Sequence, residues 1–190
     1  MEGHLVVHAL LLAFAVVFLA LLVVDTARMG APPMPSNTQE RAAVVALVER
    51  RAIELARPIR VLEAGAGWGG LALAIARAQP DFQLLAVEGS VLPAGICRLR
   101  ALVHHLLGGA MIGVRWGDFL RADYVDVDVV VAFLGPEPTT RLAEHLAQLP
   151  DPPQLVSVGF AVRSWRQRAR IRLTDGWRSE VGLWVFDPSA

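Results

Sequence analysis

The chain has 190 residues, which suits one domain and a short additional segment. Its 18 basic residues are all arginine and are balanced by 18 acidic residues, so a formal net charge of zero argues against general affinity for nucleic acid. The single cysteine excludes an internal disulfide and is typical of a reducing compartment. The five histidines show no metal-ligand spacing, so no metal site is expected.

The beginning of the chain is strongly apolar. Residues 5–24 form a twenty-residue run in which His8 is the only polar side chain, and a helix of that length crosses the hydrocarbon core of a bilayer. A cleaved signal peptide would need a basic start and a shorter apolar core, so the run predicts a retained anchor at residues 1–28. Arginines follow the run and none precedes it. The positive-inside rule therefore predicts a single-pass protein of the cytoplasmic (inner) membrane with its C-terminal domain in the cytoplasm.

A proline-broken linker, residues 29–37, precedes a predicted domain at residues 38–190. A capping box with either Ser36 or Asn37 as the cap opens its first helix. Apolar runs and helical periodicity then alternate along the domain. The predicted strands are 59–63, 82–88, 110–119, 125–136, 154–162 and two runs within 169–187, and the predicted helices are 37–56, 70–79, 94–107 and 139–149. This order predicts a doubly wound, mainly parallel seven-stranded α/β sheet with a C-terminal antiparallel hairpin, preceded by one transmembrane helix.

The loop VLEAGAGWGG, residues 61–70, supports two interpretations. Its glycines match G-x-G-x-x-G, the dinucleotide fingerprint, and with Glu63 they match E-x-G-x-G-x-G, the loop of methyltransferases that use S-adenosylmethionine. The glycines concerned are Gly65, Gly67, Gly69 and Gly70. Glu88 ends the second predicted strand, where a carboxylate binds the ribose hydroxyls of either cofactor. The loop and Glu88 therefore do not decide between the two cofactors.

Three other features favour S-adenosylmethionine over a nicotinamide cofactor. Glu63 lies two residues before the first glycine, where an acid meets the amino group of a methionine moiety but is unfavourable beside a pyrophosphate. Asp118 ends the third strand, where its carboxylate accepts a hydrogen bond from an adenine amino group. The terminal hairpin is the third feature, since a seven-stranded methyltransferase sheet is expected to end in one. The predicted cofactor-binding residues are Glu63, Gly65, Gly67, Trp68, Gly69, Glu88, Gly117, Asp118 and Phe119.

The fourth predicted strand ends at Phe133, Gly135 and Pro136, at the edge where doubly wound sheets bind ligands. With Trp165, these residues are predicted to position the methyl acceptor. Alternating arginines within 166–172 share one face of a predicted strand and are candidates for contact with anionic lipid.

Several segments carry a resemblance to a known family: PPMPSNTQE before the first helix, EAGAGWGG, VEGSVLPAGICRLRAL, VVVAFLGP and LWVFD. Through these segments the chain resembles the membrane-anchored class I lysine methyltransferases of mitochondria and their bacterial relatives, which modify ATP synthase subunit c and the adenine nucleotide translocase. The resemblance implies methyl transfer from S-adenosylmethionine to a lysine amine of a membrane-associated protein. The alternatives are a methyltransferase for a lipid or small molecule and a non-catalytic membrane-bound nucleotide-binding protein.

Overall fold

The computed structural model describes residues 2–29, 36–162, 167–173 and 181–186. The elements in chain order are α1 (Glu2–Met29), α2 (Thr38–Leu55), β1 (Arg60–Ala64), α3 (Gly70–Ala78), β2 (Gln83–Glu88), α4 (Val91–Leu106), β3 (Ile112–Trp116), η1 (Phe119–Arg121), β4 (Val129–Ala132), α5 (Pro136–Leu146), β5 (Gln154–Val158), β6 (Gln167–Leu173) and β7 (Val181–Phe186). The predicted order of helices and strands is confirmed. The third, fourth and fifth strands are shorter than predicted. Their predicted ranges include loop residues after each strand and, for the third and fourth, residues before it.

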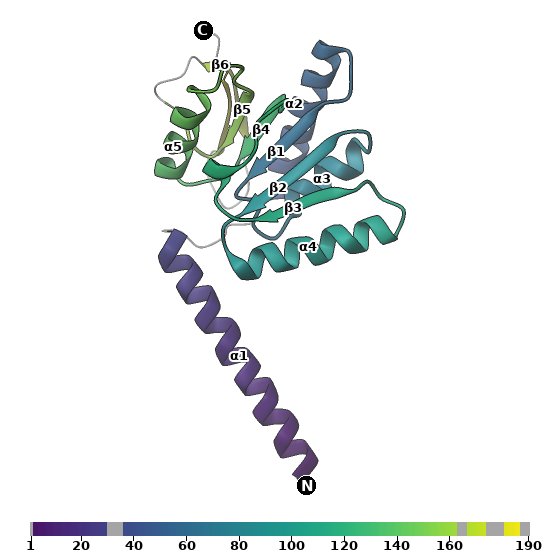
Figure 1. Ribbon diagram of the computed structural model, residues 1–190, viewed down its shortest axis with the longest axis vertical. Helices are drawn as coiled ribbons and strands as arrows, with labels where there is room; N and C mark the ends of the chain where they lie inside the picture. Colours follow the sequence, from purple (N-terminus) through teal and green to yellow (C-terminus); the bar gives the residue numbers. More distant parts are fainter. Residues whose placement is uncertain (1, 30–35, 163–166, 174–180, 187–190) are drawn as a thin grey trace.

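The strands form one seven-stranded sheet in the order β3-β2-β1-β4-β5-β7-β6 (Figure 1). Strands β1 to β5 pair in parallel, and β7 pairs antiparallel with both β5 and β6. The predicted mainly parallel sheet with a closing antiparallel hairpin is therefore confirmed. Neighbouring β1 and β4 continue toward opposite sides of the sheet, which places the topological switch point between them.

Both faces of the sheet are buried, and β4 shows why. Val129 and Val131 belong to the apolar core that includes residues of α2, α3 and α4, whereas Val130 and Ala132 belong to the core on the other face, which includes residues of α5. A strand covered on both sides needs apolar residues at every position, so β4 is a continuous apolar run with no alternation. The two cores hold the carboxyl ends of the central strands in a defined position.

Helix α2 begins where the capping box predicts. Asn37 Oδ1 accepts a hydrogen bond from the Glu40 backbone amide at 2.8 Å, and Glu40 Oε2 accepts one from the Asn37 amide at 2.7 Å. Asn37 is therefore the cap, in preference to Ser36. In the next turn Arg41 donates from Nε and Nη2 to the Ser36 carbonyl, at 3.0 and 2.8 Å. These contacts order the segment that enters the domain.

Helix α1 extends away from the sheet, approaching it near α4 (Figure 1). Among the described residues, we find no helix with the combination of length and apolarity that a membrane span requires. The span predicted at residues 5–24 is thus without support in this part of the chain.

The arginines of β6 have protein partners. Arg168 Nη2 lies 2.8 Å from Glu54 Oε1 of α2, and the Arg170 guanidinium lies 5.5 Å from the centre of the Trp184 ring. Arg166 lies outside the described residues. The lipid contact predicted for this stripe therefore competes with contacts that join β6 to α2 and β7.

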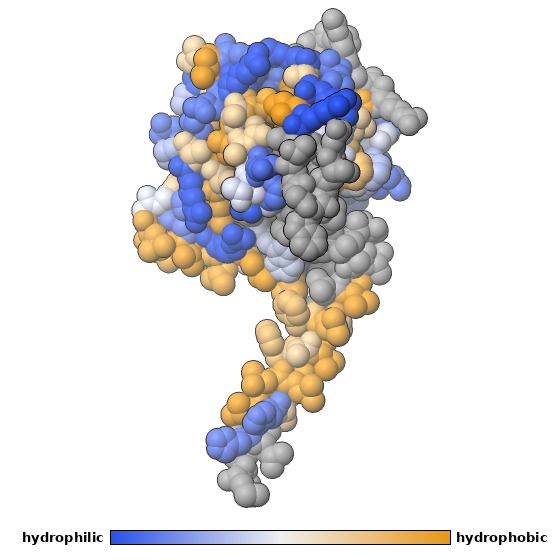
Figure 2. All heavy atoms as spheres, turned by 180° about the vertical axis from the view of Figure 1, so that it is seen from behind, coloured by the Kyte–Doolittle hydropathy of each residue, from blue (hydrophilic) through white to orange (hydrophobic). Residues whose placement is uncertain are grey.

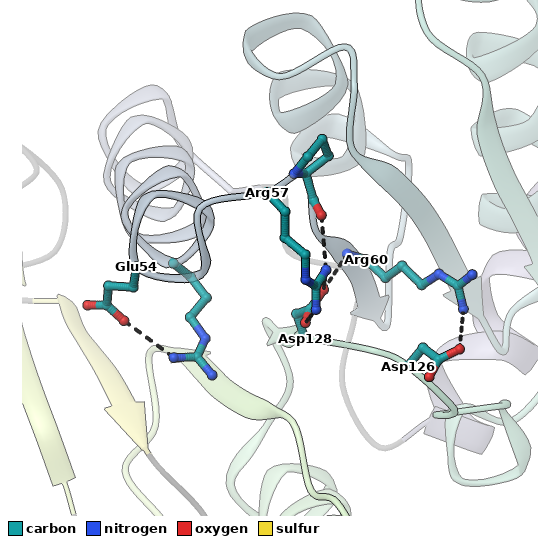
Figure 3. A network of polar contacts seen from close by, with 7 residues as sticks. Glu54, Arg57, Arg60, Asp126 and Asp128 are labelled. Atoms are coloured by element: carbon teal, nitrogen blue, oxygen red, sulfur yellow. Dashed lines mark hydrogen bonds and ion pairs between the residues drawn. The ribbon is translucent and has the colours of Figure 1, made fainter.

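One carboxylate links the amino-terminal ends of β1 and β4 (Figure 3). Asp128, just before β4, accepts two hydrogen bonds from the Arg57 guanidinium, at 2.6 and 3.0 Å, and a third from the Arg60 backbone amide at 2.8 Å. The bond to Asp128 and its negative charge raise the pKa of Arg57 above its ordinary value. Asp128 therefore aligns the starts of β1 and β4, the two strands on either side of the switch point.

We predict that Asp128→Ala lowers the Tm by a few degrees, because it removes the paired bonds to Arg57 and leaves the Arg60 amide without its acceptor. Differential scanning calorimetry would measure the shift. Asp126→Asn is the control, since that carboxylate bonds only the Arg60 side chain in this network, its side chain is 71% exposed, and asparagine tolerates the φ of +58° at this position. Equal losses for the two variants would contradict a special role for Asp128.

Candidate functional site

A cavity of about 740 Å³ opens at the carboxyl edge of the parallel strands. Its walls come from the loops after β1 to β5, together with the starts of α2 and α5. The sequence-predicted residues that line it are Glu63, Gly65, Gly67, Trp68, Glu88, Gly117, Asp118, Phe119, Phe133, Gly135 and Pro136. The structure therefore brings the predicted cofactor residues and the predicted acceptor residues together in one cavity.

Two predicted residues are not part of this wall. Gly69 is buried at the N-cap of α3 with φ +75°, and a Cβ there would lie 2.6 Å from Cys97 Sγ. This glycine lets α3 start close to α4, and its predicted contact with the cofactor stays a prediction. Trp165, predicted to position the acceptor, lies outside the described residues.

Glu88 determines the shape of the loop after β1. The carboxylate is buried at the end of β2, where Oε2 accepts a hydrogen bond from the Gly67 amide and Oε1 accepts one from the Ser90 amide, both at 2.7 Å. Each carboxylate oxygen has a further lone pair available for a ligand hydroxyl. Glu88 can therefore hold the loop and bind a diol at the same time.

Glu63 is the most unusual group of the site. Its side chain is buried at the end of β1, and burial raises the pKa of the carboxyl to about 8, with a smaller contribution from the nearby Glu88 charge. A hydrogen bond from the Ala72 backbone acts in the opposite direction. Within the described part of the chain, Glu63 Oε2 has no hydrogen-bond partner. A buried acid with one unsatisfied oxygen beside a cavity is suited to a positively charged ligand group.

The end of β3 forms the next part of the wall. Asp118 Oδ1 accepts a hydrogen bond from the Leu120 amide at 2.9 Å, which starts η1 and places this exposed carboxylate at the cavity. Trp116 also lines the cavity and donates from Nε1 to the Gly89 carbonyl at 2.9 Å. Sequence reasoning missed Trp116, although its place at the end of the third strand was a usable signal.

Arginines line the cavity as well, and sequence reasoning did not assign them to it. Arg100 Nη1 donates to the Trp68 carbonyl at 2.6 Å and thereby supports the glycine loop from α4. Arg41 on α2 and Arg141 on α5 complete the set. These residues reach the cavity only through the packing of three helices. No local pattern in the sequence could have joined them.

The β4–β5 side of the cavity differs from the β1–β3 side. Phe133, Pro136 and Phe160 give it an apolar wall, with the exposed Arg141 beside them. Leu134 approaches the glycine loop so closely that a Cβ on Gly65, at φ +75°, would overlap its side chain. All three carboxylates that line the cavity thus lie on the β1–β3 side, and the lining residues of the β4–β5 side are apolar apart from Arg141.

The chain matches no protein-family model and no curated protein. Among solved structures it is similar to an RNA methyltransferase from Salinibacter ruber in complex with S-adenosyl-L-homocysteine, at TM-score 0.65 and 18% identity over 83% of this chain and 96% of that chain. It is also similar to magnesium protoporphyrin IX methyltransferase from Synechocystis with bound S-adenosylmethionine, at TM-score 0.61 and 17% identity over 78% of each chain. An rRNA methyltransferase from Streptomyces viridochromogenes matches at TM-score 0.58 and 15% identity, over 84% and 88%.

These likenesses show the fold alone: the chain has the Rossmann-like fold that these three methyltransferases share. The narrower resemblance to the lysine methyltransferases of ATP synthase subunit c is not supported by these matches.

The raised pKa of Glu63 predicts a pH-dependent stability. Because the folded-state pKa of about 8 exceeds the ordinary 4.5, the unfolded chain releases this proton first, and the wild type loses stability as the pH rises from 4.5 to 8. Glu63→Gln removes this loss, so its Tm should rise relative to the wild type between pH 5 and about 8.5. Thermal unfolding at several pH values measures the difference. The exposed Glu137→Gln should follow the wild type throughout, and a parallel wild-type and Glu63→Gln profile would show that Glu63 is ionised in the folded protein.

Proposed function

We propose that the protein is an S-adenosylmethionine-dependent methyltransferase. The observation that carries the proposal is the buried Glu63 Oε2, which has no partner among the described residues and lies at the edge of a cavity of about 740 Å³. Glu88 and Asp118 lie at the ends of the next two strands of the sheet. The carboxylates at the ends of β1, β2 and β3 can bind, in this order, the methionine ammonium, the ribose hydroxyls and the adenine amino group of this cofactor. The solved structures of the same fold that hold S-adenosylmethionine or S-adenosyl-L-homocysteine support the same choice.

Each carboxylate has a role that follows from its surroundings. Glu63 pairs with the methionine ammonium, which supplies the partner its second oxygen lacks. Glu88 accepts hydrogen bonds from the ribose hydroxyls while its bonds to backbone amides persist. Asp118 accepts from the adenine amino group. The bound cofactor supplies an electrophilic methyl group, and the chain's task is to align the acceptor with it and to exclude water.

Cofactor binding tests the proposal. Calorimetric titration of the wild type with S-adenosyl-L-homocysteine should give tight binding that strengthens from pH 6.5 to 8.5, because the carboxyl of Glu63 must lose its proton to pair with an ammonium. Glu63→Gln should weaken binding roughly 10- to 100-fold at pH 8.5 and remove the pH dependence, since a charge-assisted hydrogen bond contributes about 1.5–3 kcal/mol.

NADH and Glu137→Gln are the controls for that titration. The exposed Glu137→Gln should bind S-adenosyl-L-homocysteine as the wild type does, and NADH should give no heat. The assignment fails if NADH binds tightly to the wild type and to Glu63→Gln while S-adenosyl-L-homocysteine gives no heat.

The acceptor side of the cavity favours an acidic lipid or small molecule. The sequence predicted a lysine amine of a membrane-associated protein, with a lipid or small molecule as the alternative. Among the described residues, Arg41 and Arg141 line the cavity and neither forms an ion pair with a carboxylate. Two guanidinium groups would repel a lysine ammonium and attract a phosphate or carboxylate. We therefore propose an acceptor that has an acidic group and an apolar part, the latter against Phe133 and Phe160.

Labelling of membranes tests the acceptor. Wild-type protein, native membranes and tritiated S-adenosylmethionine should place label in extractable lipids or small molecules, with formation of S-adenosyl-L-homocysteine. Arg141→Gln should lower incorporation roughly 10-fold, as expected for the loss of one charge-assisted bond, without changing S-adenosyl-L-homocysteine affinity. Arg77→Gln, an exposed change outside the cavity wall, should behave as the wild type. Label in protein lysines would instead favour the lysine acceptor, and no turnover would favour a nucleotide-binding protein without catalysis.

We also propose that α1 attaches the domain to a membrane, on its cytoplasmic side. Large apolar side chains stay exposed along this helix, with Leu12 at 67% and Phe14 at 69%. Burial of such side chains in lipid is favourable, and exposure of so many in water is rare in soluble proteins. The arginines that follow the helix and the cytosolic location of the cofactor support this orientation.

A further inference from the structure

Helix α4 has an apolar face that the fold does not use. Its buried side consists of small residues, including Ala94, Cys97 and Ala101, which let it pack closely on β2 and β3. Large apolar residues lie on the opposite side at helical spacing and remain exposed, and Leu107 and Met111 extend them beyond the helix. The exposed stripe consists of Leu99, Leu102, Val103 and Leu106, with Leu106 at 73%.

This stripe, here called the α4 stripe, is continuous with another exposed apolar surface. Helix α1 approaches the domain at α4, and in Figure 1 it leaves from the side of the domain that α4 forms. Figure 2 shows apolar residues along that lower edge of the domain and onward along α1. A contiguous exposed apolar surface of this kind marks an interaction site.

The charge around the α4 stripe identifies the partner. Between Glu88 and Asp118 the chain contains three arginines and two histidines but no acidic residue. Arg98 and Arg115 are exposed on α4 and on the neighbouring β3. An apolar stripe on a segment that carries exposed arginines and no acidic residue fits the interface of an anionic bilayer, where the apolar side chains enter the acyl region and the arginines meet the phosphates.

We propose that the α4 stripe is a second membrane contact, which lays the domain on an anionic lipid surface beside α1. The inference rests on the attachment through α1 proposed above. Two contacts restrict the domain's rotation, whereas attachment through α1 alone would leave it free to turn. The same orientation brings Trp116, which lies on the strand next to α4 and lines the cavity, toward the lipid side. An acceptor dissolved in the bilayer would then have a short path to the site.

Environment-sensitive probes on the full chain test the contact. Single cysteines at Leu11 of α1, Leu102 of α4 and Ile53 of α2 would be labelled with bimane, and the protein reconstituted in phosphatidylglycerol-containing vesicles with brominated acyl chains. All three side chains are exposed, and Ile53 lies on a helix separated from α4 by α3. The wild type gives the labelling background, because Cys97 is buried and burial raises the pKa of its thiol to about 11.

Bromolipid should quench the probes at Leu11 and Leu102 to a similar extent and leave the probe at Ile53 unquenched. Absence of quenching at Leu102 overturns the α4 contact. Quenching at Leu11 in the same experiment would leave the attachment through α1 standing, whereas absence of quenching there would remove the attachment as well. Efficient oxidative cross-linking of Leu102→Cys between two chains, without quenching, would identify a second copy as the partner and would also overturn the inference.

Discussion

The two hydrogen bonds that the Glu88 carboxylate accepts, from the Gly67 and Ser90 amides, connect the fold to the site. One bond sets the path of the glycine loop after β1, and the other sets the turn that begins α4. Because α3 starts directly after the loop and α4 directly after the turn, the same side chain positions both helices on one face of the sheet. A single carboxylate therefore orders the backbone that a nucleotide-like ligand would contact, and it keeps lone pairs for that ligand.

Glu63 shows the opposite principle, in which a group is left incompletely satisfied. Burial and the neighbouring Glu88 charge make its ionised form unfavourable. They raise the pKa of the carboxyl to about 8. Nothing in the packing of β1 requires an acid at this position, since the neighbouring residues Leu62 and Ala64 are buried and apolar. The cost to stability is compensated when a cation approaches Oε2, which is why a structural role alone does not account for this residue.

The predictions from the sequence matched the structure most closely where a feature depends on residues that are near one another in the chain. The Asn37–Glu40 capping box, the apolar runs of β1, β2 and β4, and the loop residues that follow them depend on neighbours a few positions apart, so their type and place could be predicted. Carboxyl ends of parallel strands meet at one edge, and the cofactor residues were predicted to lie together for that reason. The packing of Gly69 against α4 could not be predicted, because a glycine that serves a ligand and one that serves helix packing have the same sequence pattern.

The sequence by itself determined the fold class, the order of strands and helices, and the acids at the ends of β1, β2 and β3, because hydrophobic period and strand ends are properties of short segments. Only the tertiary structure decided that Arg41, Arg100, Arg141 and Phe160 share the cavity, since these residues come from separate elements and meet through packing alone. It also decided that α4 buries its small residues and exposes its large ones. From the sequence alone, either apolar face of such a helix could be the buried one. The close packing of α4 on β2 and β3 requires small side chains, so the face with alanine and cysteine is buried.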